Sequence, residues 1–437
     1  MLHREQQKGL VLQQYMSENQ PITLRRNFSW TFIGNAVYAA CQWGMLVVMA
    51  KFGSPEMVGQ FSLGLAVTTP IIMFTNLQLR VIQATDAKKQ YLFSDYLGLR
   101  LLSTAVALVI ITSISFSGLY RGEISAIILL IAVARAFECI SDVLYGLVQQ
   151  QERMDRIGIS QIIKGVLSLL FLYLGLYFTG QLVWGVTGLI LAWAFVLLTY
   201  DIPSGILLLK DKTRLKPRLY IKTVGKLIKL CLPLGLVMML IAFNSNIPRY
   251  FIEYHLGERE LGLFAPIAYI TYAGQTLEGA LEQSTSSRLA QYYMNGQTKA
   301  FINLLLKLIS LGLFIGVIAT AMATVGGKLI LSLLYTADYV KYSEIFVWFM
   351  VIMTVEYVAS FLCYGLIAAR YLRVQVPVLL TVTATSFISC LWLVPLYGVK
   401  GAVVSILIAS IVRAIISALV ILHAINKLTT VKPFYRN

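Results

Sequence analysis

Three charged side chains lie within one long apolar segment at spacings that could support chemistry. Arg135, Glu138 and Asp142 are three and four residues apart inside the segment 124–148, and this spacing places them on one stripe of a helix. Charges at bilayer depth cost several kcal/mol unless they are paired or face water. The stripe therefore indicates either a salt-bridge cluster that fixes helix packing or a cationic or proton-exchanging lining of a cavity.

A third acid repeats the pattern later in the chain. Glu356 lies eight residues before Tyr364, and Glu138 lies seven residues before Tyr145. The two acids are near counterparts, one residue out of register, and such a pair would suit coupling to a proton or sodium ion. Apart from such a coupling ion, the sequence gives no reason to expect a cofactor.

Other kinds of chemistry lack their motifs. The run Gly326-Gly327-Lys328 has neither the upstream Gly nor the Ser or Thr of a nucleotide-binding loop. The three histidines are far apart and show no zinc spacing, and the five cysteines are scattered through apolar segments. We therefore expect no ATP hydrolysis, no metal site and no enzyme.

The elements that must position these charges are membrane helices. The chain of 437 residues is 58% hydrophobic and 13% charged, with a mean hydropathy of +0.75, far more apolar than a soluble core requires. A helix needs about 20 apolar residues to cross the hydrocarbon. Twelve segments qualify, near 28–50, 58–78, 97–116, 124–148, 158–179, 182–209, 228–252, 260–285, 301–324, 342–368, 374–396 and 399–425.

The twelve segments form an internal repeat with an offset of roughly 200 to 220 residues. The matched motifs keep their order: Gly59-Gln60-Phe61 with Gly262-Leu263-Phe264, Arg80 with Arg288, Tyr145-Gly146-Leu147 with Tyr364-Gly365-Leu366, and Gly185-Val186-Thr187-Gly188 with Gly398-Val399-Lys400-Gly401. Two like-oriented halves indicate a transporter with a path between them. We expect an all-α membrane protein of about twelve helices in two pseudo-symmetric lobes, divided into 1–26, 27–209, 210–227, 228–426 and 427–437.

The net charge of +16 predicts topology rather than nucleic-acid binding. Lys and Arg gather in the loops on the amino-terminal side, most densely in the connector 210–227, whereas the opposite loops hold few. The positive-inside rule places both termini and the connector in the cytoplasm. A second role of the connector in binding anionic lipid is the less favoured alternative.

The stretch from Asn246 to Glu253, read Asn-Ile-Pro-Arg-Tyr-Phe-Ile-Glu, carries a family resemblance. With the Leu-Gly-Glu and Leu-Gly-Leu-Phe that follow, it resembles bacterial polysaccharide flippases, the Wzx-like polysaccharide transport family of the multidrug, oligosaccharidyl-lipid and polysaccharide exporter superfamily. The repeated Gly-x-Phe, Tyr-Gly and Gly-Val-x-Gly motifs are similar too. The resemblance covers essentially the whole chain and is more specific for the superfamily than for the substrate.

The resemblance implies a central cavity with a cationic lining and alternating access. Its implied cargo is an oligosaccharide on undecaprenyl pyrophosphate, moved from the inner to the outer leaflet of the bacterial plasma membrane for assembly of capsule, O-antigen or exopolysaccharide. Implied partners are the lipid bilayer, a polysaccharide polymerase and other assembly proteins. An ion-coupled multidrug exporter of the same superfamily is the alternative, because twelve helices fit both.

A pyrophosphate in a cleft of low dielectric constant needs cations, and Arg suits it because its fork donates two hydrogen bonds while staying ionised. Arg80 and Arg288, related by the repeat, are candidates to receive the headgroup at the inner mouth; their alternative role is interfacial anchoring. The full set of substrate candidates is Arg80, Arg135, Asn246, Arg249, Gln275 and Arg288.

Three polar residues of the eighth segment, Gln275, Glu278 and Glu282, share a stripe that suits sugar hydroxyls, cation exchange or neutralisation of a neighbouring Arg. The candidates for ion coupling are Glu138, Asp142, Glu278, Glu282 and Glu356. No motif names the glycan or the coupling ion, because hydroxyl recognition by scattered polar groups leaves no fixed spacing.

Overall fold

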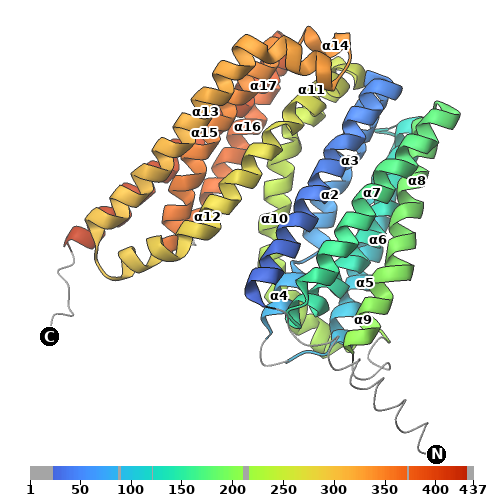
Figure 1. Cartoon of the computed structure of the whole chain (residues 1–437), viewed down its shortest axis with the longest axis horizontal. Coiled ribbons are helices and arrows are strands. Elements are labelled where there is room, and N and C mark those ends of the chain that lie inside the picture. Colours follow the sequence, from blue (N-terminus) through green and yellow to red (C-terminus); the bar gives the residue numbers. More distant parts are fainter. Residues whose placement is uncertain (1–22, 87–89, 121, 210–215, 372–373, 431–437) are drawn as a thin grey trace, which may run out of the picture. The chain divides into compact units, whose positions relative to one another are not determined.

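The chain folds into helices joined by short turns (Figure 1). The computed structural model describes residues 23–86, 90–120, 122–209, 216–371 and 374–430. In this part of the chain the elements are α2 (Leu24–Phe52), α3 (Pro55–Thr75), α4 (Leu79–Thr85), α5 (Phe93–Ser115), α6 (Glu123–Gln150), α7 (Met154–Thr179), α8 (Leu182–Val196), the π-helical turn η1 (Leu197–Asp201), α9 (Ile202–Leu208), α10 (Ile221–Leu256), α11 (Glu258–Tyr269), α12 (Thr271–Met294), α13 (Thr298–Leu334), α14 (Ala337–Val340), α15 (Ser343–Ala368), α16 (Gln375–Tyr397) and α17 (Val399–Thr430).

Eleven helical segments of the described chain are long and apolar enough to cross a membrane. They correspond to eleven of the twelve segments predicted from the sequence, and the predicted all-α membrane fold is confirmed. Many of their large apolar side chains, such as Val325, Leu329 and Trp392, are exposed, at 92%, 73% and 71%. This outward apolar surface is the one that lipid would cover.

The remaining predicted segment, 260–285, is helical but polar. It is divided at Ile270 into α11 and α12, and α12 carries Gln275, Glu278, Glu282 and Arg288. These residues remove the apolar run that the other spans possess. A helix of this composition is stable at membrane depth only when neighbouring helices or water cover its polar side chains.

The helices divide into two compact units. The first unit is Met1–Met45 with Val67–Met239, and the second is Leu46–Ala66 with Leu240–Asn437. The division falls inside α2, α3 and α10, so Leu46–Ala66 groups with the carboxy-terminal half of the chain. The expected lobes 27–209 and 228–426 follow the sequence repeat instead and stay a prediction.

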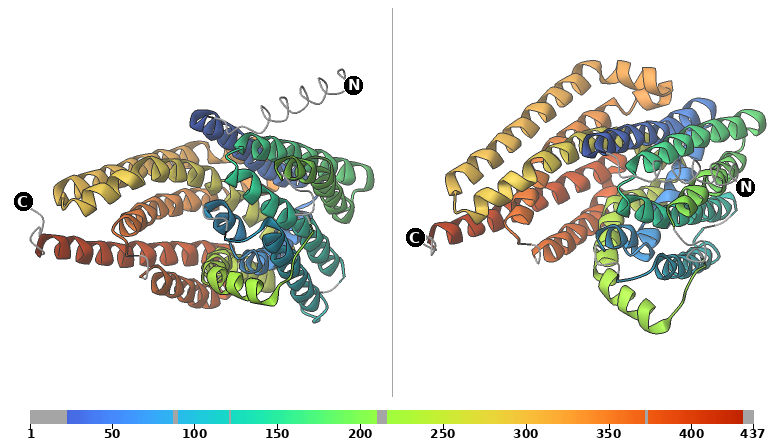
Figure 2. Two further views of the ribbon diagram at one scale, coloured as in Figure 1. Left: turned by 90° about the horizontal axis from the view of Figure 1, so that it is seen from below. Right: turned by 60° about the horizontal axis from the view of Figure 1, so that its bottom comes forward.

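Each unit is organised around one central helix. In the first, α6 packs against α4, α5, α8 and α9, and α7 packs along α8. In the second, α15 packs against α12, α13 and α17, and α16 lies along α17; the orange and red helices run beside one another in both views of Figure 2. α6 and α15 carry the repeated acid and Tyr-Gly motif, so the same repeat position supplies the centre of each unit.

The repeated Gly-x-Phe motif forms a close helix contact within the second unit. A Cβ atom on Gly59 would lie 1.9 Å from the carbonyl oxygen of Glu258, and one on Gly262 would lie 1.7 Å from that of Pro55. The two repeat-related glycines thus face each other where α3 begins against α11. The buried Tyr339 hydroxyl donates to the Gly262 carbonyl at 3.2 Å, and burial raises the pKa of this tyrosine.

Replacing Gly262 by Ala should destabilise the protein because the new methyl group meets backbone, which can give way only by separating the helices. We expect a loss of about 1–3 kcal/mol, measured as a lower melting temperature in detergent. Gly225→Ala is the matched control, since a Cβ at that helical position meets nothing within 4 Å. Equal melting temperatures for both variants would contradict the close contact.

Candidate functional site

Asp142 of the charged stripe on α6 is neutralised by two arginines from other helices. Arg100 on α5 is fully buried and donates from Nη2 to Asp142 Oδ2 at 2.8 Å; its Nη1 donates to the side chain of Asn76 in the α3–α4 turn. Arg80 on α4 places Nη1 3.7 Å from Asp142 Oδ1 and donates from Nε to Gln149 at 3.1 Å. Arg80 therefore combines an acidic partner with a side chain that is 27% exposed.

The other two members of the stripe pair with each other. Arg135 Nη1 lies 2.6 Å from Glu138 Oε2, and the Tyr38 hydroxyl on α2 donates to Glu138 Oε1 at 3.2 Å. The salt-bridge arrangement considered from the sequence is thus the one that these two residues adopt.

A second ionic network, which the sequence analysis did not single out, lies deeper in the first unit. Lys164 on α7 and Asp201 at the end of η1 are 3.5 Å apart and almost fully buried. Asp201 also accepts hydrogen bonds from Ser141 at 2.6 Å and Ser160 at 2.5 Å, and Lys164 donates to the Tyr145 hydroxyl at 3.1 Å. The network joins α6, α7 and η1 through hydrogen-bonded charges.

The π-helical turn beside this network has a local cause. Pro203, at the start of α9, has no N–H group to donate to the carbonyl four residues earlier, so the regular hydrogen-bond ladder cannot continue. The π-helical turn, in which hydrogen bonds join residues five apart, accommodates this missing donor. Asp201, the last residue of the turn, is held in it by two serine hydroxyls and a lysine.

The charges of the first unit do not cancel. Its network contains four cations, Arg80, Arg100, Arg135 and Lys164, against three acids, Glu138, Asp142 and Asp201. Arg80 is the most exposed of the four, because the side chains of Arg100, Arg135 and Lys164 are 0%, 22% and 3% exposed. Of the four cations, Arg80 is therefore the one whose side chain is most accessible.

The second unit pairs its repeat-related acid with a different helix. Arg413 on α17 lies 2.6 Å from Glu356 Oε2 on α15, and the Ser410 hydroxyl donates to Glu356 Oε1 at 2.5 Å. In the first unit the arginine partner of Glu138 comes from the same helix. The acid thus occupies an equivalent position in both units, whereas its arginine partner comes from the same helix in the first unit and from another helix in the second.

Glu278 on α12 is a buried acid whose hydrogen bond comes from a neutral group. It is 8% exposed and accepts a hydrogen bond from the Tyr364 hydroxyl at 2.6 Å, and Glu282 interacts with the same hydroxyl. Within the described residues no cation lies within salt-bridge distance of Glu278, and the buried Tyr357 hydroxyl nearby has no hydrogen-bond partner. The second-unit cluster of Glu278, Glu282, Glu356 and Arg413 is acidic overall.

The remaining candidates are placed separately within the second unit. Arg249, three residues after Asn246 on α10, donates to the Asn246 side chain at 2.7 Å, and the described chain shows no ion pair between Arg249 and Glu253. Arg288 and Gln275 on α12 are exposed. Arg288 forms no ion pair with any described residue. No group of three or more His, Cys, Asp or Glu in the described ranges is arranged to hold a metal ion.

The residues that sequence reasoning missed are Arg100, Lys164, Asp201 and Arg413. Each is a single charge inside a predicted span, which the cost of charges at membrane depth would have flagged. Each of them stands apart from other charges along its own helix, so none belongs to a charged stripe that one segment can show. Their partners lie on neighbouring helices, and a pattern within one segment cannot reveal those partners.

Comparison with known proteins places this arrangement in a family. A family model described as polysaccharide biosynthesis protein matches residues 24–279, more than half of the chain. The chain belongs to the polysaccharide biosynthesis protein family. A relative matches over most of the chain. The capsular polysaccharide biosynthesis protein CapF of Staphylococcus aureus is 27% identical over 390 residues, which cover 89% of this chain and 97% of that protein. The resemblance noted in the sequence is confirmed.

Solved structures show the fold that this polysaccharide biosynthesis protein shares. The inward-facing structure of a multidrug resistance MATE family transporter of the MOP superfamily matches with a TM-score of 0.72 at 13% identity, over 92% of this chain and 99% of that one. The outward-facing structure matches with a TM-score of 0.60 at 15% identity, over 92% and 95%. The fold is therefore a transporter fold, and the protein is a multi-pass membrane protein.

The buried pair of Lys164 and Asp201 predicts a non-additive pair of substitutions. Lys164→Met should destabilise the protein by about 3–5 kcal/mol, because it leaves a buried carboxylate without its cation. Adding Asp201→Asn should restore much of the loss, because the remaining side chain is neutral, and its amide oxygen can accept from one serine hydroxyl while its amide N–H donates to the other. Thermal unfolding of the purified variants measures both effects; a double variant at least as unstable as Lys164→Met would contradict the pairing.

Proposed function

We propose that this polysaccharide biosynthesis protein is a flippase for lipid-linked oligosaccharides. Its cargo is an oligosaccharide repeat unit on undecaprenyl pyrophosphate, moved by alternating access from the inner to the outer leaflet of the bacterial plasma membrane. Both termini face the cytoplasm in this proposal, in line with the positive-inside distribution of Lys and Arg. The delivered repeat unit would pass to a polysaccharide polymerase and other assembly proteins.

The observation that carries the proposal is the surplus positive charge of the first unit, presented by Arg80. A pyrophosphate needs compensating cations in a site of low dielectric constant, and Arg80 has its guanidinium held by Asp142 and Gln149 beside the ring of Tyr145, 5.4 Å from the ring centroid. The family match and the capsular polysaccharide relative support a cargo connected with polysaccharide.

The competing function is that of an ion-coupled multidrug exporter. The multidrug resistance MATE family transporter has the same fold as this chain. The acidic cluster of the second unit would suit a cationic drug, whereas the cationic network of the first unit would suit an anionic headgroup. The family match and the capsular relative favour the flippase, since both are named for polysaccharide biosynthesis.

Arg80→Ala should reduce delivery of surface polysaccharide about tenfold or more in cells that lack their own copy, because it removes a charge-assisted contact to the headgroup. Arg80→Lys should lose less, since it keeps the charge and lacks only the planar fork. Arg100 still neutralises Asp142 in both variants, so both should fold. Arg288→Ala and Arg288→Lys form the repeat-related test in the second unit.

Arg259→Ala is the matched control, because Arg259 is exposed and its ion pairs in the described part of the chain are with the exposed Glu56 and Asp338. It should transport normally at normal protein level. Normal transport by both Arg80→Ala and Arg288→Ala would contradict the headgroup site.

For ion coupling, we propose Glu278 as the exchanging acid, with Glu282 beside it. Glu138, Asp142 and Glu356 each have an arginine partner within salt-bridge distance, so their charge is already compensated. Glu278 takes its hydrogen bonds from neutral hydroxyl groups, and Arg413 acts on it only from beyond salt-bridge distance. Of these acids it is therefore the one that would gain most from binding a proton or a sodium ion.

Glu278→Gln should flatten the dependence of transport on pH or sodium while the protein stays folded, since Gln can keep the hydrogen bond from Tyr364. The readout is transport in proteoliposomes across a pH series and a sodium series. Glu123→Gln, at an exposed position at the start of α6, is the control and should behave as wild type. An unchanged ion dependence in Glu278→Gln would rule out this residue.

A further inference from the structure

The turn between α3 and α4 has a strained backbone. Leu77 and Gln78 have φ angles of 53° and 51°, and residues with a Cβ atom adopt this left-handed region at a cost that glycine avoids. The turn also tightens the hydrogen-bond ladder, since the Leu79 N–H donates to the Asn76 carbonyl, three residues earlier, at 3.1 Å. Helix α4 begins at Leu79, so Arg80 lies directly after the strained turn.

The repeat-related stretch of the second unit has no such turn. Arg288 corresponds to Arg80 in the sequence repeat, and the residues before it, Thr285–Ser287, belong to the uninterrupted helix α12. Arg288 is exposed, whereas Arg80 is held by Asp142 and Gln149 of α6. The repeated fold therefore does not require the interruption, which accompanies the arginine that has fixed partners.

Buried contacts hold the strained turn in the first unit. The fully buried Arg100 on α5 donates from Nη1 to the Asn76 side chain, and the Cys139 thiol on α6 donates to the same oxygen at 3.1 Å. Leu77 is buried in the apolar cluster that also contains Val143 of α6. Strained conformations persist where the surrounding structure fixes them, and they gather at functional sites.

The short helix α4 packs closely on α6 at the position of Arg80. A Cβ atom on Gly146 would lie 3.4 Å from the Arg80 Cα atom and 2.5 Å from the Gln83 side-chain amide. The preceding residue, Tyr145, places the centroid of its ring 5.4 Å from the Arg80 guanidinium carbon, and its hydroxyl is held by Lys164 at 3.1 Å. The backbone and the side chain of Arg80 are thus both set by α6.

Arg100 also affects how much of the Arg80 charge remains available. Its Nη2 lies 2.8 Å from Asp142 Oδ2, whereas Arg80 Nη1 lies 3.7 Å from the other carboxylate oxygen. The first contact is a charge-assisted hydrogen bond, and the second exceeds hydrogen-bond distance. Asp142 therefore orients Arg80 while Arg100 supplies most of the compensation for the carboxylate.

We propose that Asn76, Gln78 and Arg100 are positioning residues, which set Arg80 to bind the pyrophosphate of the cargo. The inference rests on the proposed function, because it concerns how Arg80 is presented to the headgroup. The left-handed turn directs α4 onto α6, and Arg100 holds that turn through Asn76 while it neutralises Asp142. The three residues act through Arg80 and do not themselves contact the headgroup.

Two substitutions at Gln78 separate the backbone turn from the side chain. Gln78→Gly and Gln78→Val both remove the side-chain amide, but glycine adopts the left-handed conformation freely and β-branched valine opposes it. Titration calorimetry of the purified full-length protein in detergent with farnesyl pyrophosphate, a short isoprenoid pyrophosphate, measures the affinity. Gln78→Gly should bind as the wild type does, and Gln78→Val should bind about tenfold more weakly, as expected for the loss of one charge-assisted contact.

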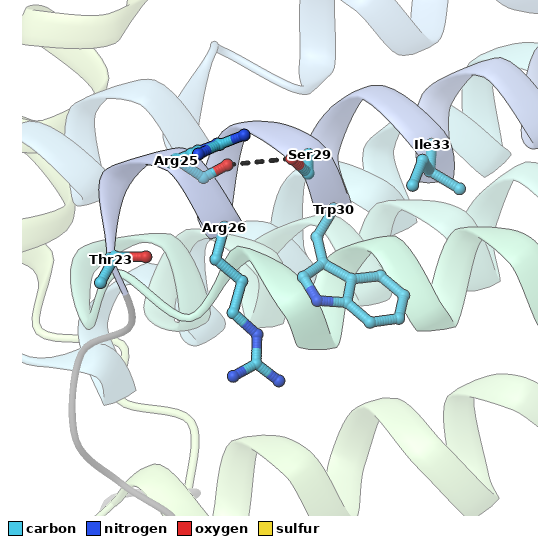
Figure 3. Close-up of a pocket in the computed structure, with 6 residues that line it drawn as sticks. All are labelled: Thr23, Arg25, Arg26, Ser29, Trp30 and Ile33. Atoms are coloured by element: carbon cyan, nitrogen blue, oxygen red, sulfur yellow. Dashed lines mark hydrogen bonds between the residues drawn. The ribbon is translucent and has the colours of Figure 1, made fainter.

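The same two substitutions in an Arg80→Ala background test whether the turn acts through Arg80. Gln78→Val should then change the affinity by less than about twofold, because the side chain that the turn positions is already absent. Arg26→Ala is the control for net charge, since Arg26 is exposed at the start of α2, where it lines the pocket shown in Figure 3. This control should leave the affinity unchanged.

Equal affinities of Gln78→Gly and Gln78→Val, with Arg80→Ala weakened, would overturn the positioning role and leave the headgroup site intact. A tenfold loss through Gln78→Val in both backgrounds would also overturn that role, since a general structural defect does not depend on Arg80. Wild-type affinity in Arg80→Ala, or an equal loss in Arg26→Ala, would overturn the headgroup site and the positioning role with it. If Gln78→Val does not fold, Asn76→Ala takes its place, and wild-type affinity in that variant would overturn the proposal.

Discussion

The cost of a charge in hydrocarbon governs the interior of this protein. Moving an ionised side chain from water to the bilayer is unfavourable by several kcal/mol unless a partner compensates it. In the first unit this requirement ties α6 to α2, α4, α5, α7 and η1, since each of those elements supplies a partner to the charged network. Helix positions that apolar packing alone would leave loosely defined are thereby fixed by directional contacts.

The same requirement gives the two units different electrostatic characters. The first-unit network has one more cation than acid, and the second-unit cluster has more acids than cations. A charge inside a transporter that no protein group compensates calls for an oppositely charged species that binds reversibly, because a charge left uncompensated at all times would destabilise the folded state. In the proposed function, an anionic cargo headgroup would meet the first need and an exchanging cation the second. The proposed flippase would use both if ions drove its transport.

Periodicity and repeats made the fold predictable. Long apolar runs specify membrane helices almost by themselves, because backbone groups in lipid must be satisfied within the helix. The repeat paired the motifs of α6 with those of α15, and the structure adds that each of these helices is central to its unit. The segment 260–285 shows the limit of that reasoning, since its polar residues make α12 unlike any other span. The Gly59 and Gly262 motifs were visible as a repeat, yet nothing in the sequence indicated that they contact each other.

The charged site was predictable only where its members share a helix. Arg135 with Glu138 and Arg249 with Asn246 follow from spacings of three residues, whereas Arg100 with Asp142 and Lys164 with Asp201 depend on which helices become neighbours. For Glu356, the sequence repeat predicted the acid but not its arginine partner, which comes from α17. Glu278 could be proposed as the exchanging acid only once the partners of the other acids were known.

The most direct test is to reconstitute the purified wild-type protein in liposomes and to measure two fluxes with one preparation. A fluorescent oligosaccharide on undecaprenyl pyrophosphate reports leaflet exchange, and a cationic dye reports drug export. The account predicts protein-dependent movement of the lipid-linked oligosaccharide and no protein-dependent movement of the dye. Movement of the dye without movement of the lipid-linked oligosaccharide would contradict it.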